Sequence, residues 1–432
     1  MKEFNKGRDK IAIIGMGYVG LPLSLLLARN YSVIGFDVDA FRIKKMQERV
    51  ATISEPGVSE LMNDTEVKQN ITYSSNPDDL KNAKVKIVTV GTPYESKIDY
   101  IDYSQIYGAL EIISGKINRG DIIILKSTVP PGTTNGIVKD KLENLGFQVP
   151  EDIGLSFSPE RMVEGQAVND FKTLPKIIGA SDPETLNTCS EIIGSLGGKV
   201  IKVSSIETAE MIKMVDNYSR FVFLGLTNEF ALISEKVGVD VLELINAAKD
   251  NYPRNSGLLL PGPGVGGSCL NKDPYILRAH MKKNGLTLKM VECATYVNSN
   301  MPYHVCELVD RYAVNRKNLT ILGVAFKGDT NDTRFTPAYQ LYNYLNDKGL
   351  KITLSDPYVS DSKFHIEKNE FAALRNSDIM LILTDHRQYK GMELKMLTDI
   401  MNKNALIIDT RGLINRNEAI NYGFEYHGLG RL

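Results

Sequence analysis

The chain has 432 residues, 43% hydrophobic and 24% charged, which is long enough for two or three domains with sizeable cores. Its 51 Lys and Arg nearly balance its 52 Asp and Glu, which argues against nucleic acid or an anionic membrane as the main partner, because both favour a basic surface. Its four cysteines form no CxxC pair, its first residues are polar, and it has no long apolar run. We therefore expect a soluble cytoplasmic protein that binds neither nucleic acid nor membrane.

The first part of the chain alternates short apolar runs with helical segments, which is typical of parallel βαβ units in a doubly wound sheet. The runs predicted to be strands are Lys10–Ile14, Ser32–Phe36, Lys86–Val90, Asp121–Leu125 and Ile153–Phe157.

The middle of the chain has a helical pattern instead. From Ile206 to Val237 there is no proline and apolar residues recur at helical spacing. Ser204 and Glu207 have the spacing of a capping box, which predicts that a long helix begins there. A further helical stretch follows Asp273, and Pro302 is predicted to kink or divide it.

Strands and helices alternate again toward the end of the chain, with strands predicted at Leu319–Ala325, Lys351–Ser355, Ile379–Leu383 and Ala405–Asp409. We therefore predict an α/β protein with two Rossmann-like doubly wound domains joined by a central all-helical region. The expected boundaries are 1–203, 204–314 and 315–432.

A glycine motif follows the first predicted strand and opens a helix. Gly15 permits a tight turn, Gly17 lets the backbone approach a pyrophosphate, and Gly20 allows close packing of helix on strand. Asp37, at the end of the next strand, can accept hydrogen bonds from a ribose 2′-hydroxyl and would repel a 2′-phosphate. The motif therefore predicts NAD rather than NADP, although Arg42 is a nearby cation that would suit the phosphate.

The second motif surrounds a cysteine in the segment Pro261–Asp273. A loop of glycine and proline leaves little side chain to build a core but presents the Cys269 thiol at a fixed place. Lys272 and Asp273 follow closely, and a neighbouring cation can lower the pKa of a thiol. The alternative, a small buried cysteine, suits the other three cysteines better. A thiol in a nicotinamide enzyme indicates two successive oxidations, from alcohol to aldehyde and then, through a thioester, to carboxylate.

Taken together, these segments resemble the UDP-glucose/GDP-mannose dehydrogenase family over nearly the whole chain. The matching segments are Gly15–Gly20 with Asp37, Val90–Pro93, Ser127–Thr133, Ser158–Arg161 with Glu164-Gly165, Glu210–Asn217, Gly264–Asp273, Gly323–Lys327 and Asp409–Gly412.

The resemblance implies the catalytic roles. Lys213 and Asn217 lie four residues apart, hence on one helix face, and match a pair that stabilises oxyanions. Asp273 matches a carboxylate that assists proton transfer or activates water near Cys269. The group around the reacting alcohol matches Thr128, Glu160 and Glu164, and which glutamate serves stays open.

The resemblance also implies the binding residues, with NAD as cofactor, a UDP-sugar as substrate and no metal. The residues implied for NAD are Gly15, Gly17, Tyr18, Val19, Gly20, Asp37, Arg42, Thr92, Thr128, Lys272 and Arg334. Those implied for the substrate are Glu160, Arg161, Lys213, Asn217, Arg254, Gly266, Lys327 and Arg411. Arg254 matches an arginine that in some members reaches the neighbouring subunit, so a homodimer or higher homo-oligomer is expected.

The motifs of the chain point to different sugars. Asn251–Asn255 and Pro261–Gly267 resemble members that act on UDP-N-acetylhexosamines, whereas Ser268 before Cys269 resembles the UDP-glucose enzymes. UDP-N-acetyl-D-mannosamine is favoured, with UDP-glucose and UDP-N-acetylglucosamine as alternatives. Two other classes of protein remain. A two-electron hydroxyacid dehydrogenase would need no Cys269. A non-catalytic nucleotide-binding protein is not expected to keep Lys213, Asn217, Cys269 and Asp273 together.

Overall fold

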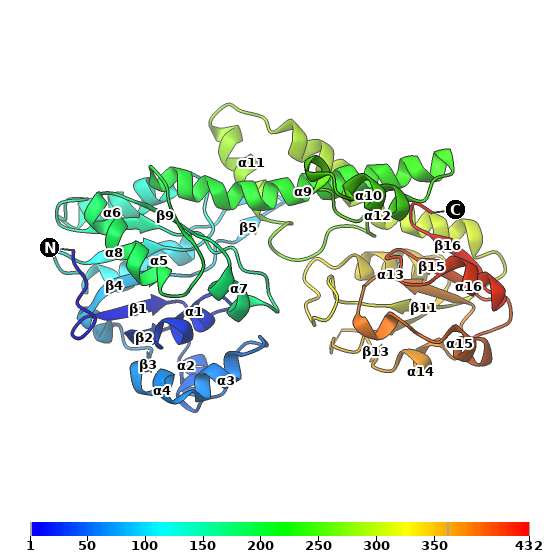
Figure 1. The fold of residues 1–432 in the computed structure, drawn as a ribbon, viewed down its shortest axis with the longest axis horizontal. Helices are drawn as coiled ribbons and strands as arrows, with labels where there is room; N and C mark the ends of the chain where they lie inside the picture. Colours follow the sequence, from blue (N-terminus) through cyan, green and yellow to red (C-terminus); the bar gives the residue numbers. More distant parts are fainter. Residues whose placement is uncertain (1, 361–362, 432) are drawn as a thin grey trace. The chain divides into compact units, whose positions relative to one another are not determined.

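The computed structural model describes residues 2–360 and 363–431. The chain divides into two compact units, Met1–Asp216 and Asn217–Leu432, and each contains a sheet built mainly or wholly from parallel strands (Figure 1). Helices fill the middle of the chain, so the predicted class of two Rossmann-like domains and a helical central region is confirmed.

The first unit is built on an eight-stranded sheet in the order β10-β9-β8-β7-β4-β1-β2-β3, in which only β8 and β9 pair antiparallel. The six neighbouring strands β3, β2, β1, β4, β7 and β8 follow the doubly wound order, which reverses between β1 and β4. The strands are β1 (Lys10–Ile14), β2 (Ser32–Phe36), β3 (Ile71–Ser74), β4 (Ala83–Val88), β7 (Ile122–Leu125), β8 (Gly154–Phe157), β9 (Lys176–Ala180) and β10 (Val200–Lys202), with a separate hairpin of β5 (Tyr94–Glu95) and β6 (Tyr100–Ile101).

Helices connect the strands of this unit: α1 (Gly20–Leu27), α2 (Ala40–Gln47), α3 (Val58–Asn63), α4 (Thr65–Asn70), α5 (Ser104–Ser114), α6 (Lys139–Asn144), α7 (Ala167–Thr173) and α8 (Pro183–Gly194). Parallel strands covered on both faces consist of nearly continuous apolar residues, as β7 does throughout and β1 does after Lys10. β4 starts and ends earlier than predicted. It contains the buried Lys86, whose ammonium lies 2.8 Å from the Asp121 carboxylate.

The central helices are α9 (Ile206–Val237), α10 (Val241–Lys249), α11 (Asp273–Lys283) and α12 (Lys289–Tyr312). The predicted cap of α9 is wrong by one residue, because Ser205 Oγ accepts the Thr208 N–H. Pro302, predicted to kink or divide a helix, does not divide it, since α12 continues through this residue. Within the described residues, no helix is both long and apolar enough to cross a bilayer.

The second unit holds a six-stranded sheet, entirely parallel, in the order β13-β12-β11-β14-β15-β16. This order repeats that of the first six strands of the other sheet and reverses between β11 and β14. The strands are β11 (Asn318–Leu322), β12 (Lys351–Ser355), β13 (Ile366–Glu367), β14 (Ile379–Ile382), β15 (Leu406–Asp409) and β16 (Glu425–Gly428), and the helices are α13 (Pro337–Asp347), α14 (Glu370–Leu374), α15 (Leu394–Ile400) and α16 (Arg416–Asn421).

A buried carboxylate joins α9 to a turn of the first unit. Glu210 accepts hydrogen bonds from Gly132 N (2.6 Å), Thr134 N (2.8 Å) and Thr134 Oγ1 (2.6 Å). Burial raises the pKa of Glu210 to about 7, and the donors of Thr134 and Gly132 oppose part of that rise. The folded chain therefore holds this proton more tightly than the unfolded chain does.

This raised pKa predicts a pH dependence of stability. The contribution of Glu210 is fully present below its ordinary pKa near 4.5 and is lost as the pH rises through about 7. Relative to Glu210→Gln, which cannot ionise, we expect the wild-type chain to lose up to about 3 kcal/mol of stability between pH 5 and 8. Melting temperatures of both proteins across this range provide the measurement, and parallel curves would contradict the assignment.

Candidate active site

The glycine turn after β1 has the geometry that a dinucleotide needs. Gly15 has φ +98°, in the left-handed region that favours glycine. A Cβ at Gly20 would lie 1.8 Å from Gly15 O, so α1 packs on this turn too closely for any side chain. A Cβ at Gly17 would meet nothing within 4 Å, which leaves open space beside the backbone. The turn therefore suits a pyrophosphate at the N-terminus of α1.

Asp37 anchors this turn from the end of β2. Its Oδ2 accepts hydrogen bonds from Met16 N and Arg42 Nη1, both at 2.8 Å, and its Oδ1 accepts one from Asp39 N at 3.0 Å. Oδ1 keeps acceptor capacity for a ribose hydroxyl. Because Arg42 is paired with Asp37, this cation is held against a carboxylate rather than presented to a 2′-phosphate.

A cavity of about 380 Å³ opens at the point where the strand order reverses. Gly15, Gly17, Asp37 and Arg42 line it, and these were all predicted. Gln105, on α5, was missed: it lines the same cavity, and its Oε1 accepts the Gly91 N–H. A single glutamine on a helix carries no sequence signal of this role. The remaining lining residues are Ile14, Phe36, Val38, Thr89, Val90, Gly91, Gly108, Ala109 and Ile112.

Three other residues implied for the cofactor lie in the same unit. Tyr18 is 38% exposed, and Val19 directly precedes α1. Thr92 is buried, and its Oγ1 donates to Thr128 O at 2.5 Å, which fixes the backbone of the implied catalytic threonine.

Glu160 is held on both sides of its carboxylate. Its Oε1 accepts the N–H groups of Arg161 and Met162, both at 2.8 Å, and its Oε2 lies 3.1 Å from Lys126 Nζ. The buried Lys126 was not predicted, although it directly precedes the Ser127–Thr133 motif. Glu164 is half-buried. Glu160 thus accepts two hydrogen bonds at Oε1 and forms an ion pair at Oε2. Arg161 itself forms a bidentate ion pair with Asp216 (2.6 and 3.1 Å).

Lys213 and Asn217 lie one turn apart on α9. Lys213 is only 8% exposed, and its ammonium makes no hydrogen bond or ion pair with any residue that the structure describes. A buried cation without a partner is costly unless a ligand brings negative charge. Lys213 therefore has the properties of an anion-binding group.

Cys269, in the second unit, is exposed and lies just before α11. The N–H groups of Lys272 and Asp273 donate to Cys269 O at 3.3 and 2.9 Å, so the cysteine backbone caps the helix. Asp273 is 2% exposed, and Asn217 Nδ2 donates to its Oδ2 at 2.5 Å. Its Oδ1 lies 3.6 Å from Lys272 Nζ and accepts no hydrogen bond from the described residues. The structure therefore joins Asn217 of α9 to Asp273 and Lys272, which follow the cysteine closely along the chain.

The loop before Cys269 packs against the C-terminal sheet domain. A Cβ at Gly266 would lie 2.3 Å from Phe326 Cβ, and one at Gly267 would lie 2.7 Å from the Phe326 ring. A Cβ at Gly262 would lie 2.6 Å from Arg411 Nη1. Gly266 and Gly267 are therefore required, because the loop lies directly on Phe326, which follows β11. Gly262 lies against the guanidinium of Arg411, which follows β15.

The basic residues implied for binding in the second unit differ in their partners and in their exposure. Lys327 is half-buried, and its ammonium makes no hydrogen bond or ion pair within the described part of the chain. Arg411 is paired with Asp385 (3.3 Å) and Arg334 with Asp332 (2.6 Å). Arg254 is exposed beside the Tyr252 ring.

Comparisons with known proteins match the whole architecture. Models of the UDP-glucose/GDP-mannose dehydrogenase family match residues 9–196 (NAD binding domain), 207–300 (central domain) and 320–416 (UDP binding domain). The UDP-N-acetyl-D-mannosamine dehydrogenase of Methanococcus aeolicus is 31% identical over 99% of this chain and 97% of its own. The UDP-glucose 6-dehydrogenase of Rickettsia bellii is 29% identical over 97% and 99%. The structure of the UDP-D-ManNAc dehydrogenase of Pyrococcus horikoshii superposes with a TM-score of 0.88 at 30% identity, covering 98% of this chain and 99% of that one. The cofactor of the first domain is therefore NAD.

The pairing of Asp37 with Arg42 predicts how the cofactor is selected. Asp37→Ser removes the charge that repels a 2′-phosphate and releases Arg42, so we expect the ratio of NADPH to NADH affinity to rise roughly tenfold to a hundredfold. Asp39→Ser is the matched control, because its exposed carboxylate lies 3.9 Å from Arg42. Fluorescence titration with both reduced cofactors gives the ratio, and an unchanged ratio in Asp37→Ser would refute this basis of selection.

Proposed function

The chain belongs to the UDP-glucose/GDP-mannose dehydrogenase family, and we propose on that premise that it oxidises the C6 alcohol of a UDP-sugar to a carboxylate, with Cys269 as covalent nucleophile. The observation that carries the proposal is the exposed Cys269 beside the buried Asn217–Asp273 pair. Each of the two oxidations would transfer a hydride to one NAD, so the NADH formed first is exchanged for a second NAD before the second oxidation. In this proposal residues 1–203 bind NAD, 204–314 supply the nucleophile, and 315–432 bind UDP.

The first oxidation converts the alcohol to an aldehyde and requires a group that removes the hydroxyl proton. Both oxygens of Glu160 are engaged, by backbone N–H groups and by Lys126. The contact with Lys126 is an ion pair, and Oε2 of Glu160 accepts no hydrogen bond within the described residues. We therefore propose that Glu160 or Glu164 takes this proton, directly or through a water beside Thr128.

The second oxidation proceeds on the enzyme. The Cys269 thiolate adds to the aldehyde carbon and forms a thiohemiacetal, whose oxyanion the Lys213 ammonium and an Asn217 N–H stabilise. Loss of a second hydride gives a thioester. Water then adds to the thioester, the carbon–sulfur bond breaks, and the carboxylate leaves while Cys269 regains its thiol. Asp273, with Oδ1 open to a hydrogen bond, takes a proton from that water.

UDP-N-acetyl-D-mannosamine is the proposed sugar nucleotide, and its product is the corresponding uronate. The motif around Asn251–Asn255 and the relatives from Methanococcus aeolicus and Pyrococcus horikoshii support this choice. Ser268 before Cys269 and the relative from Rickettsia bellii favour UDP-glucose as the second candidate.

The thioester route makes a quantitative prediction. With NAD and a panel of UDP-sugars, we expect two NADH for each sugar consumed, because the aldehyde does not leave before the second oxidation. Cys269→Ser should lower turnover by at least about a thousandfold, because the hydroxyl is a far weaker nucleophile than a thiolate. Absorbance of NADH and mass spectrometry of the sugar product are the measurements.

Cys293→Ser is the matched control for this experiment, since Cys293 is a second exposed cysteine and has no proposed role. It should retain wild-type turnover. One NADH per sugar, with the aldehyde as product, would exclude the thioester and favour a two-electron dehydrogenase. Normal turnover by Cys269→Ala would exclude the nucleophile.

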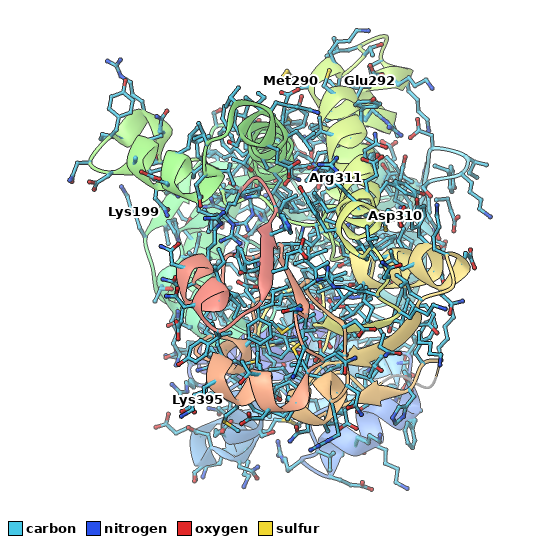
Figure 2. All side chains as sticks on the ribbon, turned by 90° about the vertical axis from the view of Figure 1, so that its right-hand side faces the viewer. Lys199, Met290, Glu292, Asp310, Arg311 and Lys395 are labelled. Atoms are coloured by element: carbon cyan, nitrogen blue, oxygen red, sulfur yellow. The ribbon has the colours of Figure 1, made fainter. Side chains whose placement is uncertain are left out.

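We further propose that a second copy of the chain docks along α9. Five large apolar side chains of this helix are exposed, and their spacings of four, eleven, seven and four residues keep them on one face: Met211, Val215, Leu226, Ile233 and Val237. Met290, also exposed, stands near the start of α12 (Figure 2). Arg254 is exposed as well, as a residue that reaches the site of a partner subunit must be.

If a second copy docks on the apolar face of α9, charged side chains introduced on that face should dissociate the oligomer. Val215→Glu combined with Ile233→Glu should convert the dimer to a monomer, because the carboxylates would be buried without partners. Light scattering during size-exclusion chromatography reports the mass. Met396→Glu, at an exposed apolar position on α15, should leave the mass unchanged. A wild-type monomer would refute the proposal.

A further inference from the structure

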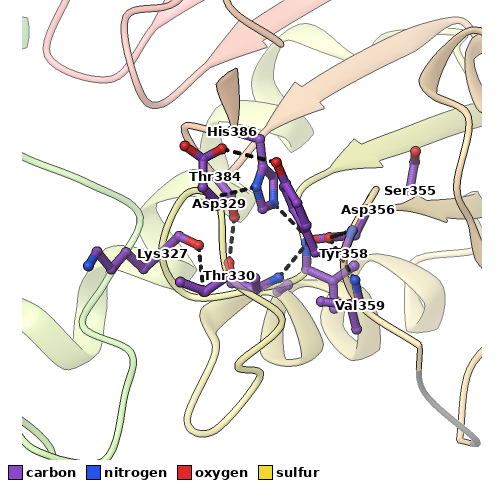
Figure 3. Close-up of polar contacts among 12 residues, drawn as sticks. Lys327, Asp329, Thr330, Ser355, Asp356, Tyr358, Val359, Thr384 and His386 are labelled. Carbon is purple, nitrogen blue, oxygen red and sulfur yellow. Dashed lines mark hydrogen bonds and ion pairs between the residues drawn. The ribbon is translucent and has the colours of Figure 1, made fainter. Parts of the chain in front are cut away.

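The second sheet reverses its strand order between β11 and β14, and open α/β sheets bind ligands outside the carboxyl ends of strands at such a point. The segment that follows β11 contains Lys327, and the segment that follows β14 contains His386. His386 is fully buried between the two, and it is not among the residues assigned above (Figure 3).

Both ring nitrogens of His386 form hydrogen bonds, one as acceptor and the other as donor. Nδ1 accepts the backbone N–H of Asp329 at 2.9 Å, so it carries no proton. Nε2 lies 3.0 Å from Asp356 Oδ2 and therefore donates its hydrogen to that carboxylate. The ring is thus neutral, and it bridges the end of β12 to the turn after β11.

Asp356 has no capacity left for a ribose. Its Oδ1 accepts the N–H groups of Tyr358 and Val359, and its Oδ2 accepts those of Val324 and Ala325 as well as His386 Nε2. Burial raises the pKa of Asp356, but the hydrogen bond from His386 and the backbone donors outweigh it and hold the pKa below its ordinary value.

Other groups around His386 complete the support of the same turn. The rings of Tyr358 and Tyr389 lie 5.1 and 5.3 Å from the imidazole, centroid to centroid. Arg387 donates from its backbone N and its Nε to the Asp329 carboxylate. The Asp329 backbone is therefore held from inside the domain by His386, and its side chain from the surface by Arg387.

The supported turn carries two groups with consequences for the substrate. The Lys327 side chain extends away from the hydrogen-bonded cluster (Figure 3). Phe326, the preceding residue, lies under Gly266 and Gly267 of the loop that leads to Cys269. The same turn thus positions two groups. One is the Lys327 ammonium, which has no partner in the described chain, and the other is Phe326, which supports the loop that leads to Cys269.

We propose that His386 is a positioning residue for the nucleotide-sugar: as a neutral imidazole it holds the 326–330 turn so that Lys327 meets the diphosphate. This inference rests on the proposed function, because it takes Lys327 as a ligand of UDP. His386 does not touch the reacting atoms, so it should affect binding of substrate and transition state equally and raise KM without lowering kcat.

Three variants separate its hydrogen bonds. His386→Asn keeps an acceptor at the δ1 position for Asp329 N–H and loses the donor to Asp356. His386→Gln keeps a donor for Asp356 and loses the δ1 acceptor, and His386→Leu loses both. His365→Gln, at an exposed histidine, is the control. The full-length proteins are compared by calorimetry with UDP at pH 8, where its terminal phosphate is fully ionised, and by steady-state kinetics.

We expect the Gln and Leu variants to raise the Kd for UDP and the KM for the UDP-sugar about tenfold, the free-energy equivalent of one lost hydrogen bond. The Asn variant should stay within about threefold of wild type, and kcat and the KM for NAD should be unchanged in all. If the Leu variant does not fold, the Gln variant carries the same expectation.

The outcomes distinguish this inference from the proposed function. Wild-type protein that binds UDP but oxidises no UDP-sugar refutes the function, and the Kd values of the variants still decide the inference. Unchanged UDP affinity in the Gln and Leu variants overturns the inference alone, as does an equal loss of NAD affinity, which would show a general folding defect. Wild-type protein that binds no UDP overturns both.

Discussion

In each sheet, an aspartate at the end of one strand accepts hydrogen bonds from the glycine turn at the end of the neighbouring strand, and each candidate binding site is built on that contact. In the first unit Gly15 N donates to Phe36 O and Met16 N donates to the Asp37 carboxylate. The second unit has the same pair of hydrogen bonds: Gly323 N donates to Ser355 O, and Val324 N donates to the Asp356 carboxylate. A carboxylate can accept several N–H groups at once, so a single side chain fixes the turn that faces the ligand.

The two repeats differ in what else the carboxylate binds. Asp37 accepts one further N–H and a hydrogen bond from the half-buried Arg42, and a cavity remains beside it. Asp356 accepts three more backbone donors and His386, and it is fully buried. The same backbone geometry therefore leaves one crevice open to a cofactor and closes the corresponding position in the other, where the cation of Lys327 lies on the outer side of the turn.

Much of this could be predicted from the sequence, because apolar runs in parallel strands and glycine turns are local signals. β1, β2 and β12 have the predicted bounds, and Asp37 and Asp356 each directly follow a predicted strand. The short edge strands β3, β10 and β13 were missed because so few residues carry no clear alternation. Lys126, Gln105 and His386 were also missed. Their roles depend on partners 34, 14 and 57 residues away in the chain, which no spacing rule connects.

The close packing of Gly266 and Gly267 on Phe326 has a consequence for how the family can diversify. Neither glycine can gain even a methyl group without displacing an aromatic ring, so this part of the nucleophile loop cannot adapt to a new sugar by changing side chains. Val265 and Ser268, on either side, carry side chains and are only partly buried. They flank these two tightly packed glycines, which makes them the positions where a redesign of sugar preference should begin.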